Sequence, residues 1–149
     1  ADLSSLRMLD LNDNFLTKEA LAAGFHAFDL PGLGSLSLSR NELSDLPVEV
    51  FDRLSSLAQL NLQDNLIQTL DEGVFSPLRS LRFLNVSLNQ LTRIKRRSLS
   101  GLQSLEELDV SKNRLETLES RSLEPLRNLR ALRLEGNQLR KVDADAFPE

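Results

Sequence analysis

The 149-residue chain contains no cysteine, tryptophan or tyrosine, and its single histidine is His26. Without cysteine the chain has no disulfide bonds, no thiol catalysis and no cysteine-ligated zinc. One histidine leaves no multi-histidine metal site and almost no basis for a histidine-dependent catalytic triad. We therefore expect no catalytic residues, no metal and no cofactor.

A basic excess is also missing, because 18 Lys and Arg residues face 22 Asp and Glu residues, a net charge of −4. Nucleic-acid binders use a basic excess to release counterions from phosphates, so no nucleic-acid partner is expected. No apolar run reaches the roughly 18 residues of a membrane span, so no direct membrane insertion is expected. The first residues also lack the pattern of a signal peptide.

What the chain has in excess is leucine, which occurs 35 times and in a regular pattern. The unit Leu-x-x-Leu-x-Leu-x-x-Asn occurs six times, with Val86 and Val110 in place of the third leucine of two copies. The copies lie at residues 6–14, 33–41, 57–65, 81–89, 105–113 and 129–137. The asparagines are spaced once by 27 residues and then four times by 24. A repeat of this period predicts one coil per unit.

A single coil cannot bury its own apolar side, so successive coils must stack. The Leu-x-Leu alternation predicts a short strand in each copy, with the leucines inward. We expect an α/β solenoid, a right-handed superhelix with a concave parallel β-sheet and a mostly non-helical convex side. We expect residues 1–149 to form a single domain of six repeats, with strands near the six asparagine units. The three extra residues of the first copy predict a two-turn helix with Thr17 as N-cap and Gly24 just after its end.

The unit that begins Leu57-x-x-Leu60-x-Leu62-x-x-Asn65 resembles the 24-residue "typical" subclass of the leucine-rich repeat family. This resemblance covers nearly the whole chain and implies an extracellular protein, as in Toll-like receptor ectodomains, Slit-like guidance proteins and neuronal adhesion proteins. Those relatives usually carry cysteine-rich caps, which are absent here. The chain starts inside a coil and stops just before another, so we expect a fragment of a longer array. Uncapped ends would favour end-to-end self-association.

Two columns of this repeat have a structural interpretation. The asparagine amides are expected to bind backbone groups where each strand turns away. Phe51, Phe75 and Phe147 are expected to pack in the core, and His26 has no ligand partners to propose.

The outward strand positions are the ones that the core does not dictate. Phe83 is read as an exposed aromatic among polar neighbours, which is typical of an interface anchor. The predicted concave partner-binding residues are Gln59, Asn61, Phe83, Asn85, Glu107, Asp109 and Arg133. Asn85-Val86-Ser87 is the only sequon and marks a possible N-glycosylation at Asn85, which would make the chain a glycoprotein and obstruct that face.

Two further clusters allow other functions. Glu107 and Asp109 resemble a carboxylate pair of a glycan-acting enzyme, although Arg133 is expected to pair with Asp109. The alternation of Arg82, Glu106 and Arg130 predicts surface pairing. The basic strip 93–97 suits a sulfated polysaccharide or an anionic lipid, but Lys95 is expected between Asp71 and Glu119, and Arg96 beside Glu72.

The sequence thus predicts a non-catalytic recognition module that binds a protein ligand or co-receptor in an extracellular or cell-surface receptor, adhesion or guidance protein. The alternatives are a cytoplasmic leucine-rich repeat scaffold, which would explain the missing cysteines, and the enzyme using Glu107 and Asp109.

Overall fold

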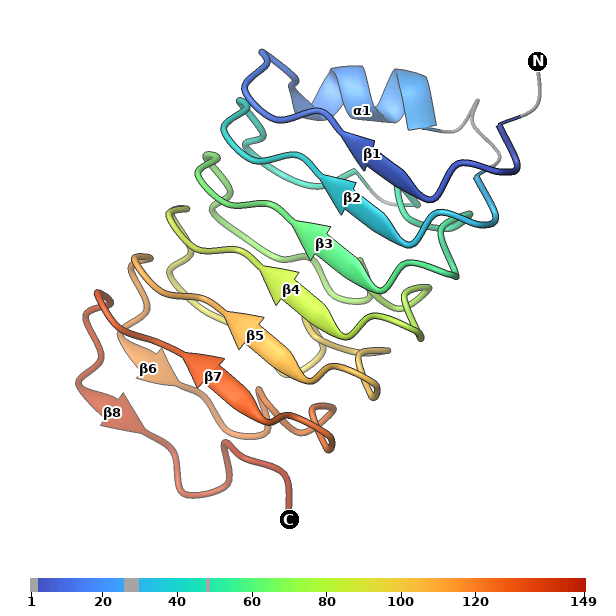
Figure 1. Ribbon diagram of the computed structural model, residues 1–149. Helices are drawn as coiled ribbons and strands as arrows, with labels where there is room; N and C mark the ends of the chain where they lie inside the picture. Colours follow the sequence, from blue (N-terminus) through green and yellow to red (C-terminus); the bar gives the residue numbers. More distant parts are fainter. Residues whose placement is uncertain (1–2, 26–29, 48) are drawn as a thin grey trace.

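The computed structural model describes residues 3–25, 30–47 and 49–149. One six-stranded parallel sheet runs along it in the order β1-β2-β3-β4-β5-β7, and Figure 1 shows these strands stacked side by side. They are β1 (Met8–Asp10), β2 (Ser35–Ser37), β3 (Gln59–Asn61), β4 (Phe83–Asn85), β5 (Glu107–Asp109) and β7 (Ala131–Arg133). Each predicted copy supplies one strand, so the predicted solenoid is confirmed.

The strands pair exactly one repeat apart, which places equivalent residues side by side across the sheet. Leu36 pairs with Leu60, Leu60 with Leu84, and Leu84 with Leu108. These central leucines point inward and are at most 2% exposed. Leu9 and Leu132, on the two outermost strands, are only partly buried because a neighbouring coil covers them on one side alone. The core therefore runs continuously through the stack.

The predicted asparagine column is confirmed. In each of the last five copies the amide donates to carbonyls of its own coil and of the preceding coil. Its oxygen accepts a backbone N–H of the preceding coil, as Asn89 does from Ile67 at 3.0 Å. Asn14, in the first copy, donates to two carbonyls of its own coil, and the structure describes no bond from it to another coil. The column satisfies buried backbone groups and ties each coil to the one before it.

The residue just before each asparagine has a left-handed backbone. The φ angles lie between +53° and +73° at Asp13, Arg40, Asp64, Leu88, Lys112 and Gly136. Only the last is glycine, which adopts this region without steric cost. This turn, three residues after the end of each three-residue strand, directs the chain away from the sheet.

The convex side contains mainly turns, as predicted. Phe51 and Phe75 are buried and stack with ring centroids 5.9 Å apart. Phe147 is 50% exposed, so its predicted core position is wrong, since no further coil packs on its ring in the structure. A two-stranded parallel sheet of β6 (Thr117–Leu118) and β8 (Lys141–Val142) adds a convex element that the sequence did not predict.

Helix α1 (Lys18–Phe25) lies in the long first copy. Thr17 Oγ1 accepts the N–H of Ala20 at 3.3 Å, so the predicted N-cap is confirmed. The helix continues through Gly24 to Phe25, so the prediction that Gly24 follows its end is wrong. His26 lies outside the described residues.

Candidate functional site: the concave face

The outward residues of the six-stranded sheet form the concave face and stand in two columns. The first column is Met8, Ser35, Gln59, Phe83, Glu107 and Ala131; the second is Asp10, Ser37, Asn61, Asn85, Asp109 and Arg133. The face carries a hollow of about 300 Å³ over β2 to β7. All seven residues predicted for partner binding line this hollow: Gln59, Asn61, Phe83, Asn85, Glu107, Asp109 and Arg133. The structure brings the predicted set together; that these residues bind a partner stays a prediction.

Phe83 lies in the middle of the hollow but is not the bare aromatic that the sequence suggested. Its side chain is partly buried, and the guanidinium carbon of Arg82 lies 5.7 Å from the ring centroid. Arg82 is in turn fixed by Glu106, whose two oxygens each accept from its Nη2 at 3.0 Å. One positioned cation over an aromatic ring is a stabilising cation–π arrangement. The Phe83 ring is therefore partly covered by Arg82 of its own coil, which is in turn held by Glu106 of the next coil.

Of the surface pairing predicted for Arg82, Glu106 and Arg130, only the pair of Arg82 and Glu106 is confirmed. Arg130 makes no ion pair with any residue that the structure describes. Arg133, on the concave face itself, pairs with Glu107 at 3.5 Å and not with Asp109 as predicted. Asp109 and Arg133 are register partners. The long arginine side chain nevertheless reaches diagonally to the other column, since diagonal neighbours lie within reach of long side chains.

The second column also has a structural role that the sequence analysis did not predict. Oδ1 of Asn61, Asn85 and Asp109 each accepts the backbone N–H two residues later, at 2.9–3.0 Å. These are Asx turns, in which a short polar side chain caps its own backbone. The signal was present as Asp or Asn followed two residues later by a polar residue, but the outward position suggested freedom. The Oδ1 atom of each of these three side chains therefore already bonds to the backbone of its own coil.

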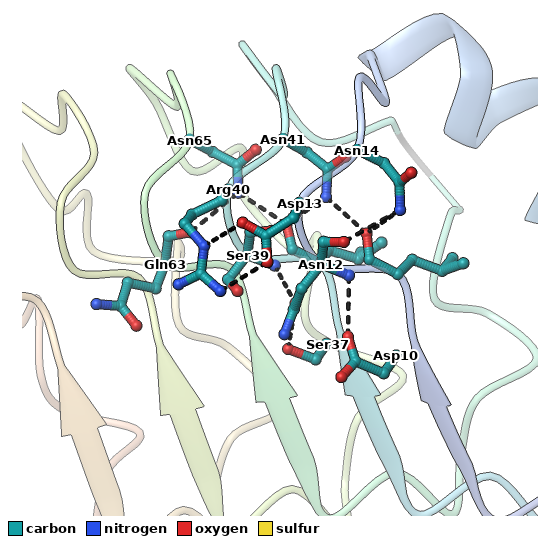
Figure 2. A network of polar contacts seen from close by, with 12 residues as sticks. Asp10, Asn12, Asp13, Asn14, Ser37, Ser39, Arg40, Asn41, Gln63 and Asn65 are labelled. Carbon is teal, nitrogen blue, oxygen red and sulfur yellow. Dashed lines mark hydrogen bonds and ion pairs between the residues drawn. The ribbon is translucent and has the colours of Figure 1, made fainter.

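In the second column, Ser37 stands where other strands have Asn or Asp. Figure 2 shows that a residue of the preceding coil supplies the acceptor instead. Asn12 Oδ1 accepts both the Ser37 hydroxyl at 2.6 Å and the Ser39 N–H at 2.8 Å. Asp10 supplies the ordinary Asx turn of the first coil by accepting the Asn12 N–H. The first coil therefore supplies the cap of the second coil.

A surface ion pair flanks this network. Arg40 Nη2 lies 2.8 Å from Asp13 Oδ2, and both side chains are more than half exposed. The side-chain hydrogen bond from Arg40 lowers the pKa of Asp13 below its ordinary value of 3.8, and Coulomb attraction to the same guanidinium acts in the same direction. Solvent screens such an exposed pair, so we assign it no role in the hollow.

Asn85 occupies the centre of the hollow with its oxygen already bonded. Oδ1 accepts from the N–H and the hydroxyl of Ser87, at 2.9 Å and 2.6 Å. A glycan attached to the amide nitrogen of Asn85 would fill the hollow between Asn61 and Asp109, the register neighbours of Asn85. Glycosylation and partner docking at this position therefore exclude each other.

The basic strip 93–97 lies on the convex side, where two predicted pairings are wrong. Arg93, rather than Lys95, pairs with Glu119 at 2.9 Å, and Arg96 pairs with Glu124 at 3.9 Å rather than with Glu72. Both partners belong to the following coil. The ionic partners of Arg93 and Arg96 therefore come from the C-terminal neighbour.

No group of three or more potential metal ligands occurs among the described residues. Within the same part of the chain, no helix has the length and apolar character needed to cross a membrane.

Comparison with known proteins agrees with this architecture. The family model described as "Leucine rich repeat" matches residues 31–91 and 84–139. No curated protein gives a significant match. A crystal structure of a TLR13–ssRNA13 complex superposes with a TM-score of 0.85 at 32% sequence identity, covering 97% of this chain and 20% of that one. The chain thus spans a fifth of that protein's length. With six stacked coils, a confirmed asparagine column and a family match over most of its residues, the chain belongs to the leucine-rich repeat family.

Proposed function

We propose that the chain is a non-catalytic recognition module whose concave face binds a protein partner, as part of an extracellular or cell-surface receptor, adhesion or guidance protein. The observation that supports this most is the hollow that gathers all seven predicted residues around Phe83. The similarity to TLR13 supports the receptor-like assignment over a cytoplasmic scaffold.

The chemistry of the hollow suits a protein surface. Its β2 and β3 side is uncharged and polar, Phe83 forms its apolar centre, and Glu107 and Asp109 supply negative charge toward β7. Protein interfaces combine a buried aromatic anchor with a polar rim in this way. A volume of about 300 Å³ lies at the lower limit for small-molecule sites, and it accommodates a few side chains of a docked loop.

RNA, the ligand in the TLR13 complex, fits this hollow less well. Glu107 and Asp109 would repel phosphates, and Phe83 is the only aromatic residue in the lining. Binding of single strands relies on basic grooves and several stacking aromatics.

The carboxylate pair is also poorly suited to hydrolysis. Glu107 contacts Arg133, and Asp109 Oδ1 holds the Ser111 turn. A general acid and a nucleophile each need a free carboxyl group directed at substrate. In a glycan-hydrolysis screen, the Glu107→Gln variant should therefore give the same result as the unchanged protein.

The proposal is tested by screening the immobilised chain against purified secreted and cell-surface ectodomains, with a single-stranded RNA as a separate probe. For a true partner, Phe83→Ala should weaken binding about 30-fold or more, because truncating an anchor costs at least about 2 kcal/mol. Arg96→Ala, on the convex side, should leave the affinity almost unchanged. Thermal unfolding of both variants establishes that they remain folded.

A binder that survives Phe83→Ala but is lost on Arg96→Ala would place the protein site on the convex side. Binding of RNA alone, or a panel without a Phe83-dependent binder, would also count against the proposal.

A further inference from the structure

The convex side carries a second hollow, of about 330 Å³, that the concave site does not use. Its lining includes Arg96, Arg97, Gly101, Glu124 and Arg127. Three guanidinium groups therefore face one carboxylate. This local excess of positive charge occurs in a chain whose net charge is −4, so it does not follow from the overall composition.

The turn that presents Arg96 and Arg97 is fixed on both sides. Ile94 before it and Leu99 after it are buried in the core. Ser98 is also buried; its hydroxyl donates to the Leu70 carbonyl at 2.8 Å and accepts the Lys95 N–H at 3.1 Å. The two arginines thus project from a rigid backbone, which lowers the entropic cost of binding.

The wall formed by Gly101 is equally constrained. Gly101 has a φ of +94°, and a Cβ at this position would lie 2.5 Å from the Cα of Ser76 in the preceding coil. No side chain is therefore tolerated here, and the two coils approach each other closely beside the hollow. On the following coil, Arg127 comes directly after the buried Leu126.

The charges in the hollow are only partly compensated. Arg96 has a distant partner in Glu124, at 3.9 Å. The side chains of Arg97 and Arg127 make no ion pair or hydrogen bond with any described residue. Two arginine forks are thus available to an anionic ligand, and such forks bind planar or tetrahedral oxyanions through paired N–H donors.

From these contacts we propose that the convex hollow binds a sulfate group of a sulfated polysaccharide, with Arg97 and Arg127 as the main contacts and Glu124 as an opposing charge. The lining contains no aromatic side chain to stack on a base, which disfavours single-stranded nucleic acid. A small basic site in an otherwise acidic chain also suits discrete sulfate groups better than the extended anionic surface of a membrane.

The test uses a heparin oligosaccharide and the intact chain, with binding measured by isothermal titration calorimetry at low and physiological salt. Arg97→Gln and Arg127→Gln should each weaken binding about tenfold, because each removes a charge-assisted hydrogen-bond donor. Glu124→Gln should strengthen binding, since it removes the opposing carboxylate. Arg114→Gln is the matched control: it removes the same charge from the exposed turn after Asn113 and should leave the affinity unchanged.

Equal losses in all three arginine variants would reduce the effect to net charge and overturn the site. Full binding of a desulfated oligosaccharide would overturn the sulfate assignment. Tighter binding of a single-stranded RNA, or of vesicles containing anionic lipid, would assign the hollow to another ligand class. Because Phe83 lies on the opposite face, these outcomes do not depend on the concave proposal.

Discussion

Asn89 satisfies four backbone groups in two coils with one side chain. Its amide donates to the carbonyls of Leu62, Val86 and Ser87, and its oxygen accepts the Ile67 N–H. All of these contacts are buried, so Asn89→Ala should lower the free energy of unfolding by about 1–3 kcal/mol, as is usual when buried groups lose their partners. Denaturant-induced unfolding measures this cost.

Asn14 provides a control from the same column. Its side chain is exposed, and among the described residues its amide bonds to the Leu11 and Asn12 carbonyls of its own coil. Asn14→Ala should therefore cost clearly less than Asn89→Ala. Equal costs would show that the contacts between coils add nothing to stability.

Ser98 and Ser122 hold equivalent convex positions in successive coils, but their hydroxyl groups differ in hydrogen bonding. The Ser98 hydroxyl has two backbone partners, whereas the Ser122 hydroxyl is buried and has no hydrogen-bond partner among the residues that the structure describes. Ser98→Ala should destabilise the chain by about 1–3 kcal/mol, and Ser122→Ala should leave stability unchanged or raise it by about 1 kcal/mol. Thermal and denaturant unfolding of the two variants give the comparison; a loss at Ser122 as large as that at Ser98 would contradict the assigned bonding.

At the scale of the element, the cap of β2 makes a sharp prediction. Asn12→Ala removes the acceptor of the Ser37 hydroxyl and the Ser39 N–H, which should cost about 1–2 kcal/mol. Adding Ser37→Asn places an amide two residues before Ser39, as Asn61 stands before Gln63. The double variant should recover much of the lost stability in a double-mutant cycle. Strictly additive effects would show that the two caps are not equivalent.

The elements also show what the sequence could predict. The repeat period predicted the six strands of the main sheet, their register and the asparagine column, because these depend on backbone hydrogen bonds that repeat with the chain. The same register assembled the lining of the concave hollow from its seven predicted residues.

The Asx-turn roles of Asn61, Asn85 and Asp109 were missed, because an outward position gives no indication of what its oxygen bonds. The predicted partners of Arg133, Lys95 and Arg96 were also wrong, since long side chains reach diagonally and across coils. Periodicity fixes where a Cα lies and leaves the end of a flexible side chain undetermined.

For the whole molecule, stability depends on a core shared between neighbouring coils. Leu84 is 2% exposed and has a coil on each side, so Leu84→Ala should cost about 2–5 kcal/mol through the cavity it leaves. Leu132 holds the same position in β7 but is only partly buried. Leu132→Ala should cost less, and denaturant unfolding of both variants would contradict the stacked-core account if Leu132→Ala cost as much.

The cap that the first coil lends to the second has a consequence for engineering. In a repeat array, single coils are natural units to remove, duplicate or transplant, because each contacts mainly its neighbours. Here the first two coils are not separable, since removing the first would strip the Ser39 N–H of its acceptor. Cuts after the second coil leave every Asx turn with its own residue. A chimaera should therefore carry the first two coils together as one cassette.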